Sequence, residues 1–157
     1  MKREFIAMQE LGEKLIDLTT DQLNSIGLDE SLLAAVLDAR SIKSHGALRR
    51  QKQLIGKLMR ETDPQPIREA LDRFSQQDRV DKDQFKRAES WRDRIVNEGA
   101  PALAEFSEAT GSASRKLQSL VKSMQATAGE SGRRRIRRQI FREIHRQLSG
   151  GMQSDTD

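Results

Sequence analysis

Apolar residues recur at spacings of three and four along most of this chain, and this pattern limits the fold more than any other feature. It begins in residues 2–18, where Leu11, Leu15 and Leu18 follow one another in this way. One face of an α-helix repeats every 3.6 residues, so the pattern indicates amphipathic helices. Only 35% of residues are hydrophobic and 33% are charged, so any core must be assembled from narrow apolar stripes. Abundant Leu, Arg, Gln, Glu, Lys and Ala also favour an all-α fold.

The first part of the chain is expected to form long helices. After the helix over residues 2–18, whose stripe includes Phe5, a short turn begins at Thr19 and ends at Gly27. A helix of about 30 residues is expected from Asp29 to Arg60, with a kink near Ser44-His45-Gly46 as the alternative. Asp63 and Pro64 open a third helix, which is either continuous to Gly99 or broken near Gln77. Its apolar stripe is formed by Ile67, Leu71, Phe74, Phe85, Ala88, Trp91 and Ile95.

Shorter helices are expected after Gly99-Ala100-Pro101, over residues 102–109, 113–126 and 132–148. The whole pattern predicts two small helical bundles, with long second and third helices. The expected parts are an N-terminal subdomain with a long helical hairpin (1–99), a C-terminal three-helix subdomain (100–149) and a disordered tail (150–157).

Several function classes are disfavoured by what the sequence lacks. Cysteine is absent, which excludes disulfides and thiolate sites. No stretch approaches the roughly 20 apolar residues needed to cross a bilayer, and a cytoplasmic location is expected. His45 and His145 have no second ligand at a metal-binding spacing, and Ser119-Leu120-Val121-Lys122 lacks the companion motifs of serine acylases. We therefore expect no catalytic or metal site, no cofactor and no small-molecule substrate.

A first basic face is predicted within residues 41–60, which contain no acidic residue. Projected at about 100° per residue, Leu48, Ile55 and Met59 fill one side of the helix. Gly56 falls within the opposite arc, where a residue without a side chain would allow another backbone to approach closely. The predicted RNA contacts on this arc are Arg49, Arg50, Lys52, Lys57 and Arg60.

A second and stronger basic face is predicted in residues 133–146, where Glu143 is the single acid. Ile136, Ile140, Ile144 and Leu148 form the apolar stripe of this helix. Like charges at helical spacing repel one another, and an anionic partner would reverse that cost. Arginine also suits bidentate contact with phosphate. The predicted RNA contacts here are Arg134, Arg135, Arg138, Arg142 and Arg146.

Together the faces predict recognition of RNA through its backbone and shape. Phe141 is the lone aromatic residue near the second face, so base stacking is not expected as the chief mode. Four other interpretations stay open: ordinary solvated helix faces, a membrane-surface helix, a calmodulin-binding helix, and a DNA-binding regulator. The last lacks a convincing recognition helix with base-contacting side chains.

Residues 48–60, Leu-Arg-Arg-Gln-Lys-Gln-Leu-Ile-Gly-Lys-Leu-Met-Arg, are followed by Pro-Ile-Arg-Glu-Ala-Leu at 66–71. These segments resemble the signature of the bacterial DarP (YjgA) family of ribosome maturation proteins. Residues 91–95 through Gly99, and residues 138–142, agree with the same family. The resemblance covers residues 10–148.

The resemblance implies a cytoplasmic ribosome biogenesis factor that acts without catalysis. Its partners would be ribosomal RNA and late precursor particles of the large subunit, with ribosomal proteins as further candidates. It would bind 23S ribosomal RNA and aid maturation of the peptidyl transferase centre. The resemblance also implies a dumbbell of helical bundles. The alternative function is a helical protein-interaction module that docks on a ribosomal protein or another assembly factor.

Overall fold

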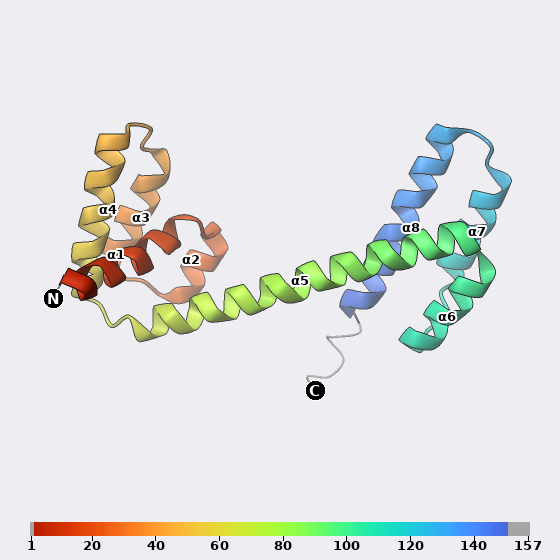
Figure 1. Cartoon of the computed structure of the whole chain (residues 1–157), viewed down its shortest axis with the longest axis horizontal. Coiled ribbons are helices and arrows are strands. Elements are labelled where there is room, and N and C mark those ends of the chain that lie inside the picture. Colours follow the sequence, from red (N-terminus) through yellow and green to blue (C-terminus); the bar gives the residue numbers. More distant parts are fainter. Residues whose placement is uncertain (1, 151–157) are drawn as a thin grey trace. The chain divides into compact units, whose positions relative to one another are not determined.

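The computed structural model describes residues 2–150, and every regular element among them is an α-helix (Figure 1), which confirms the all-α class. No helix in this range is both long enough and apolar enough to cross a membrane. The tail expected after Gly150 lies outside the described residues. The helices are α1 (Lys2–Ile16), α2 (Thr20–Ile26), α3 (Glu30–Ser41), α4 (His45–Arg60), α5 (Gln65–Glu98), α6 (Ala100–Thr110), α7 (Arg115–Ala126) and α8 (Glu130–Gly150).

The chain divides into two compact units between Gln77 and Asp78, and α5 contributes residues to both. The helix α5 is continuous through Gln77, so the expected alternative of a break there is wrong. It is also the longest helix, with 34 residues. The subdomain boundary expected at residue 99 and the dumbbell arrangement stay predictions.

The single helix expected from Asp29 to Arg60 is wrong, because the chain leaves the helical conformation at residues 42–44. Ile42 is extended (φ −80°, ψ 124°), and so is Ser44 (φ −77°, ψ 130°). The Ser44 hydroxyl accepts a hydrogen bond from the Ala47 amide, which starts the new helix α4. The two helices α3 and α4 pack side by side as a hairpin (Figure 1). The apolar spacing runs across the break because both helices face one core.

The core of the first unit is built where α1 packs against α3 and α4. A Cβ atom at Gly12 would lie 2.6 Å from Cγ2 of Ile55, and one at Gly56 would lie 3.0 Å from Cβ of Gln9. Gly56 therefore does allow the close approach predicted for it, and the backbone that approaches is α1. Its predicted place in the basic arc is wrong, because Gly56 is buried in this contact. The most deeply buried side chains of this core are Leu15, Leu23, Leu32, Val36, Ile55, Met59 and Ile67.

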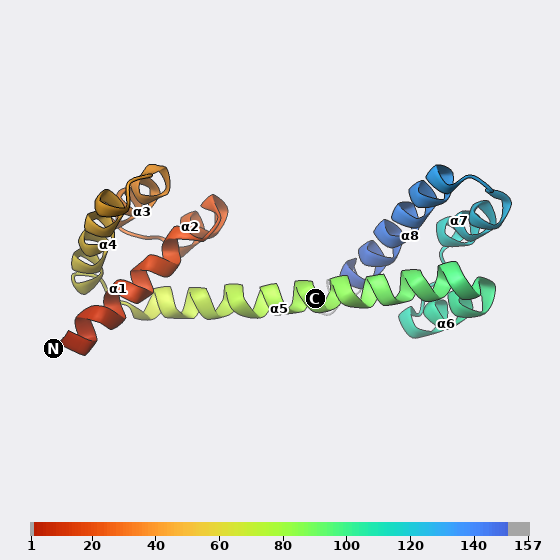
Figure 2. The same cartoon turned by 45° about the horizontal axis from the view of Figure 1, so that its top comes forward.

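The second unit combines the part of α5 after Gln77 with α6, α7 and α8, and Figure 2 shows α7 and α8 side by side. Short punctuation sets the helix ends, as predicted. Gly99 has φ +74°, Pro101 lies in the first turn of α6, and the Ser114 hydroxyl caps α7 at the Leu117 amide. The core contains Ala88, Ile95, Ala102, Phe106, Leu117, Ile140 and Ile144, with Trp91 packed against it.

Two phenylalanines depart from the predicted buried stripes. Phe5 is 43% exposed at the start of α1, and Phe85 is 48% exposed in the second unit. Both had been placed in the core by periodicity alone.

Candidate nucleic-acid interface

The basic side chains predicted on α4 do not form a uniform set. Arg49, Arg50, Lys57 and Arg60 are exposed, on the side of the helix opposite Ile55. Lys52 is half-buried and lines a surface groove that also contains Glu10 and Glu13 of α1 and Asp17, which follows α1. The acid-free surface of α4 therefore comprises four of the five predicted residues, and Lys52 lies at its edge in a mixed electrostatic environment.

Arg60 is held by a residue that the sequence interpretation assigned to the core. Its guanidinium carbon lies 4.0 Å from the centre of the Phe5 ring. A cation over an aromatic face is attracted by the ring's quadrupole, and the contact covers part of a ring that stays 43% exposed. The α1 terminus thus contributes to the basic surface of α4.

The basic side chains predicted on α8 are more prominent. Arg134, Arg135, Arg138 and Arg142 are all exposed, and none forms an ion pair with a residue in the described range 2–150. Their apolar counterparts Ile140 and Ile144 are fully buried against α5 and α7. The predicted separation of a basic arc from a buried stripe therefore exists on this helix. We call these four side chains the α8 arginine arc.

Arg146 differs from the arginine arc because it already has an anionic partner. It donates to Glu143 through Nη2 at 2.6 Å and through Nε at 3.2 Å. Glu143 is only 4% exposed, and it also accepts a hydrogen bond from Gln147. The hydrogen bond from Arg146 holds the pKa of Glu143 below its ordinary value. Part of the charge of Arg146 is therefore compensated within α8.

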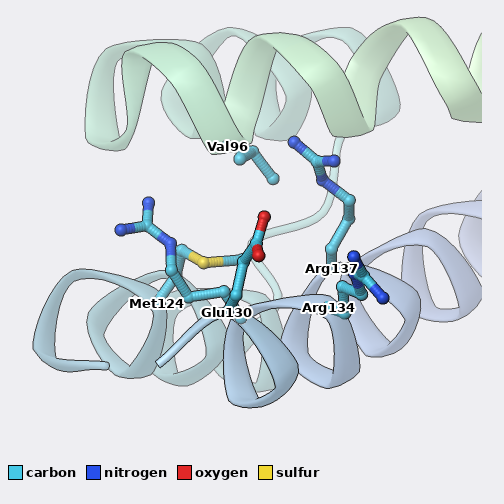
Figure 3. A pocket seen from close by; sticks show the side chains of 6 residues that line it. Val96, Met124, Glu130, Arg134 and Arg137 are labelled. Carbon is cyan, nitrogen blue, oxygen red and sulfur yellow. The ribbon is translucent and has the colours of Figure 1, made fainter. Parts of the chain in front are cut away.

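A pocket at the start of α8 adds two arginines that the helical projection left out. Arg133 and Arg137 line it together with Arg134, Glu130, Val96 and Met124. Figure 3 shows Arg137 extending from α8 toward α5, where Val96 lies. Arg137 was not among the predicted contacts, but the first turns of α8 leave it exposed. Exposure there depends on where the neighbouring helices end, which periodicity does not reveal.

An aromatic cluster lies beside the arginine arc, and we define it as Phe85, Phe141 and His145. The ring centres of Phe85 and Phe141 are 5.0 Å apart with an edge-to-face angle of 65°. Phe141 and His145 are stacked at 5.7 Å, and Phe85 lies 6.2 Å from His145. Sequence analysis found Phe141 alone, because Phe85 comes from α5 and is brought to α8 only by folding.

Among residues 2–150 no group of side chains could hold a metal ion.

Comparison with known proteins places the chain in a family. The family model described as dual-action ribosomal maturation protein DarP matches residues 1–145. The relative of that name from Thiobacillus denitrificans is 35% identical over 150 residues, which cover 96% of this chain and 85% of the relative. The one from Chromobacterium violaceum is 37% identical over 144 residues, covering 91% of this chain and 79% of the relative.

A further relative of the same name, from Nitrosomonas eutropha, is 43% identical over 106 residues. That alignment covers 68% of this chain but only 60% of the relative's length. The family model and the two longer alignments extend over both units of the chain. The resemblance of residues 48–60 and of the later segments is thereby confirmed, and the chain belongs to the DarP family of ribosomal maturation proteins.

Proposed function

We propose that the chain is a cytoplasmic ribosome biogenesis factor that binds 23S ribosomal RNA in late precursors of the large subunit. There it aids maturation of the peptidyl transferase centre without catalysing a reaction. The observation that carries this proposal is the α8 arginine arc, Arg134, Arg135, Arg138 and Arg142, exposed and without an acidic partner in the described chain. Membership of a ribosomal maturation family supports ribosomal RNA as the polyanion.

Phosphate neutralisation is the physical basis of this binding. Four guanidinium groups on one side of a helix repel one another, and phosphates placed between them convert that repulsion into attraction. Each guanidinium can donate two parallel hydrogen bonds to one phosphate. Arg49, Arg50, Lys57 and Arg60 on α4 supply a second surface of the same kind. Contacts of this type recognise the shape of an RNA helix rather than its sequence.

The salt dependence of binding measures how much of the affinity has this origin. Neutralising five to eight phosphates gives a log–log slope of affinity against salt of about −4 to −7 on duplex-like RNA. Association with a ribosomal protein through the helical surfaces would show weak salt dependence and would survive RNase treatment. Titration in increasing salt, with and without RNase, therefore separates RNA binding from the alternative of a protein-interaction module.

Charge reversal tests the arginine arc directly. The triple variant Arg134→Glu, Arg138→Glu and Arg142→Glu is expected to lose co-sedimentation with large-subunit precursor particles. A matched control reverses three exposed arginines of α5, Arg73, Arg79 and Arg87, whose neighbours include the acids Asp72, Asp78 and Asp83. The control carries the same change in net charge and is expected to keep most of the binding. Retained binding by the α8 variant would exclude α8 as a contact surface.

A further inference from the structure

The aromatic cluster of the second unit remains partly exposed to solvent, although its rings pack against one another. Phe85 keeps 48% of its surface accessible although it contacts two other rings. The guanidinium of Arg92 lies 5.6 Å from the centre of the Phe141 ring and supports that ring from α5. The three rings therefore form a fixed aromatic surface, held by side chains of α5 and α8, rather than a single exposed residue.

Arginines border this surface on the α8 side. Phe141 and His145 line a shallow surface hollow together with Arg142, Arg146 and Ser149. Arg138 lies one helical turn before Arg142 on the same arc. On the α5 side the neighbours one turn from Phe85 include the acids Asp81 and Glu89, so phosphates are expected on the α8 side. The rings of Phe141 and His145 and the guanidinium of Arg142 thus line one hollow, and Phe85 packs against Phe141 beside it.

Bases and aromatic side chains stack because both have flat polarisable faces. Proteins that recognise RNA loops splay unpaired bases onto such rings, with basic side chains along the backbone. Duplex RNA could not use this surface, since its bases are stacked inside the helix. The combination of rings and arginines therefore fits an unpaired nucleotide better than it fits duplex RNA.

We propose that Phe85, Phe141 and His145 form a stacking site for an unpaired RNA base, with Arg142 contacting the adjacent phosphate. This inference rests on the proposed RNA binding and adds single-stranded RNA to the ligand of that surface. It departs from the expectation drawn from the sequence, in which base stacking was not the chief mode because Phe141 had no aromatic neighbour. The arginine arc binds the RNA backbone, and the aromatic cluster selects an RNA segment that has an unpaired base.

Two hairpin RNAs with the same stem test the proposal. One has a loop of unpaired adenosines, and the other has the same loop with abasic nucleotides, so the two probes have equal charge and length. The full chain is expected to bind the adenosine loop about tenfold more tightly than the abasic loop, since one stacked base contributes that much. The double variant Phe85→Leu and Phe141→Leu is expected to remove most of this preference while keeping its affinity for the abasic hairpin.

The controls separate stacking from folding and from phosphate binding. Leucine keeps the apolar volume of both positions, and unchanged affinity for the abasic hairpin reports that the arginine arc is intact. Phe74→Leu alters a half-buried phenylalanine of α5 in the first unit, which belongs to neither basic surface, and is expected to leave the preference unchanged. Phe85→Trp is expected to retain it, because tryptophan also stacks.

Three results would overturn the inference, and they differ in what else they exclude. Equal binding of the two hairpins by the unaltered chain, with the steep salt dependence intact, would reject the stacking site and leave RNA binding standing. Absence of salt-dependent binding to either hairpin would reject the proposed function, and the stacking site with it. A preference for the adenosine loop that survives both leucine substitutions would also reject the aromatic cluster as its source.

Discussion

Glu143 is the single acidic side chain between Arg133 and Arg146, and its burial explains why it does not interrupt the basic surface. The carboxylate lies on the inner side of α8, where it accepts hydrogen bonds from Arg146 and Gln147. Lys116 of α7 lies 3.9 Å away. Glu143 thus compensates the charge of Arg146 and leaves the charges of the arginine arc without an acidic partner.

Replacing Glu143 with glutamine is expected to destabilise the chain in a pH-dependent way. Loss of the charge-assisted hydrogen bonds costs about 1 kcal/mol at neutral pH, a modest value because Arg146 is solvent-exposed. Since folding lowers the pKa of Glu143 below its ordinary value of 4.5, this stabilisation is present above that value. It is lost as the pH falls through the lower pKa of the folded state.

Urea unfolding of the Glu143→Gln variant and the unaltered chain, repeated from neutral pH to below pH 4.5, measures this difference. The two free energies of unfolding should converge at the acid end. Glu108→Gln on the exposed side of α6 is the matched control and should show no such convergence. A Glu143→Gln difference that stays constant with pH would contradict the ion-pair explanation.

Arg146 and Arg138 are expected to respond differently to the same substitution. Arg146→Gln breaks the paired contact with Glu143, so it should lower the thermal unfolding midpoint and change RNA affinity only slightly. Arg138→Gln removes an exposed unpaired cation, so it should leave the midpoint unchanged and weaken RNA binding by about fivefold. Calorimetry and a filter-binding titration measure the two quantities. A larger affinity loss for Arg146→Gln would show that its pairing does not remove it from the interface.

At the scale of single helices, the sequence predicted best what is determined locally. Thr19 and Gln22 form a reciprocal capping pair, and Gly27 and Gly111 end their helices with positive φ. The basic arcs were also predictable, because exposure along a helix follows the spacing of its buried stripe. The break at residues 42–44 was anticipated only by the alternative of a kink near Ser44-His45-Gly46, because apolar spacing continues across it. Ser44 was the available signal, as an N-cap in front of a basic helix.

Features that depend on contacts between helices could not be read from spacing. Phe85 has the period of a buried residue, but the helices of the second unit leave it at the surface. Its partner Phe141 is distant in sequence, so the aromatic cluster had no local signal. Gly12 likewise carried no visible reason for lacking a side chain. Its role appears only where α1 meets Ile55 of α4.

The close contact between α1 and α4 predicts that Gly12→Ala destabilises the chain, whereas Gly46→Ala, which lies outside this contact, does not. Gly12→Ala places a methyl group 2.6 Å from Ile55, whose side chain is fully buried and cannot move aside freely. The resulting strain should outweigh the gain in helix propensity and lower the free energy of unfolding by about 1–2 kcal/mol.

Gly46→Ala is the matched control in α4, because no atom lies within 4 Å of the added Cβ. Its helix propensity should leave stability unchanged or raise it by up to about 1 kcal/mol. Thermal or chemical unfolding of both variants gives the comparison. Stabilisation by Gly12→Ala would mean that α1 and α4 do not approach as closely as described.

For the whole molecule, the central fact is that the two cores share no residue. The first gathers side chains from α1 to α4 and the start of α5, and the second gathers those of the later part of α5 with α6 to α8. Each basic surface is supported by its own core, α4 by the first and α8 by the second. Stability of one surface should therefore be separable from stability of the other, even though α5 is continuous.

Matched substitutions in the two cores test this separation. Ile55→Val removes one buried methyl group from the first core, and Ile140→Val removes one from the second. Each loss costs about 1 kcal/mol, so amide exchange should become about fivefold faster in the affected unit. Ile55→Val should accelerate exchange in α1, α3 and α4 while α7 and α8 keep their rates, and Ile140→Val should do the reverse. RNA binding through the arginine arc should then be more sensitive to Ile140→Val. Uniform acceleration along the chain by either variant would instead mean that α5 couples the two units into one cooperative fold.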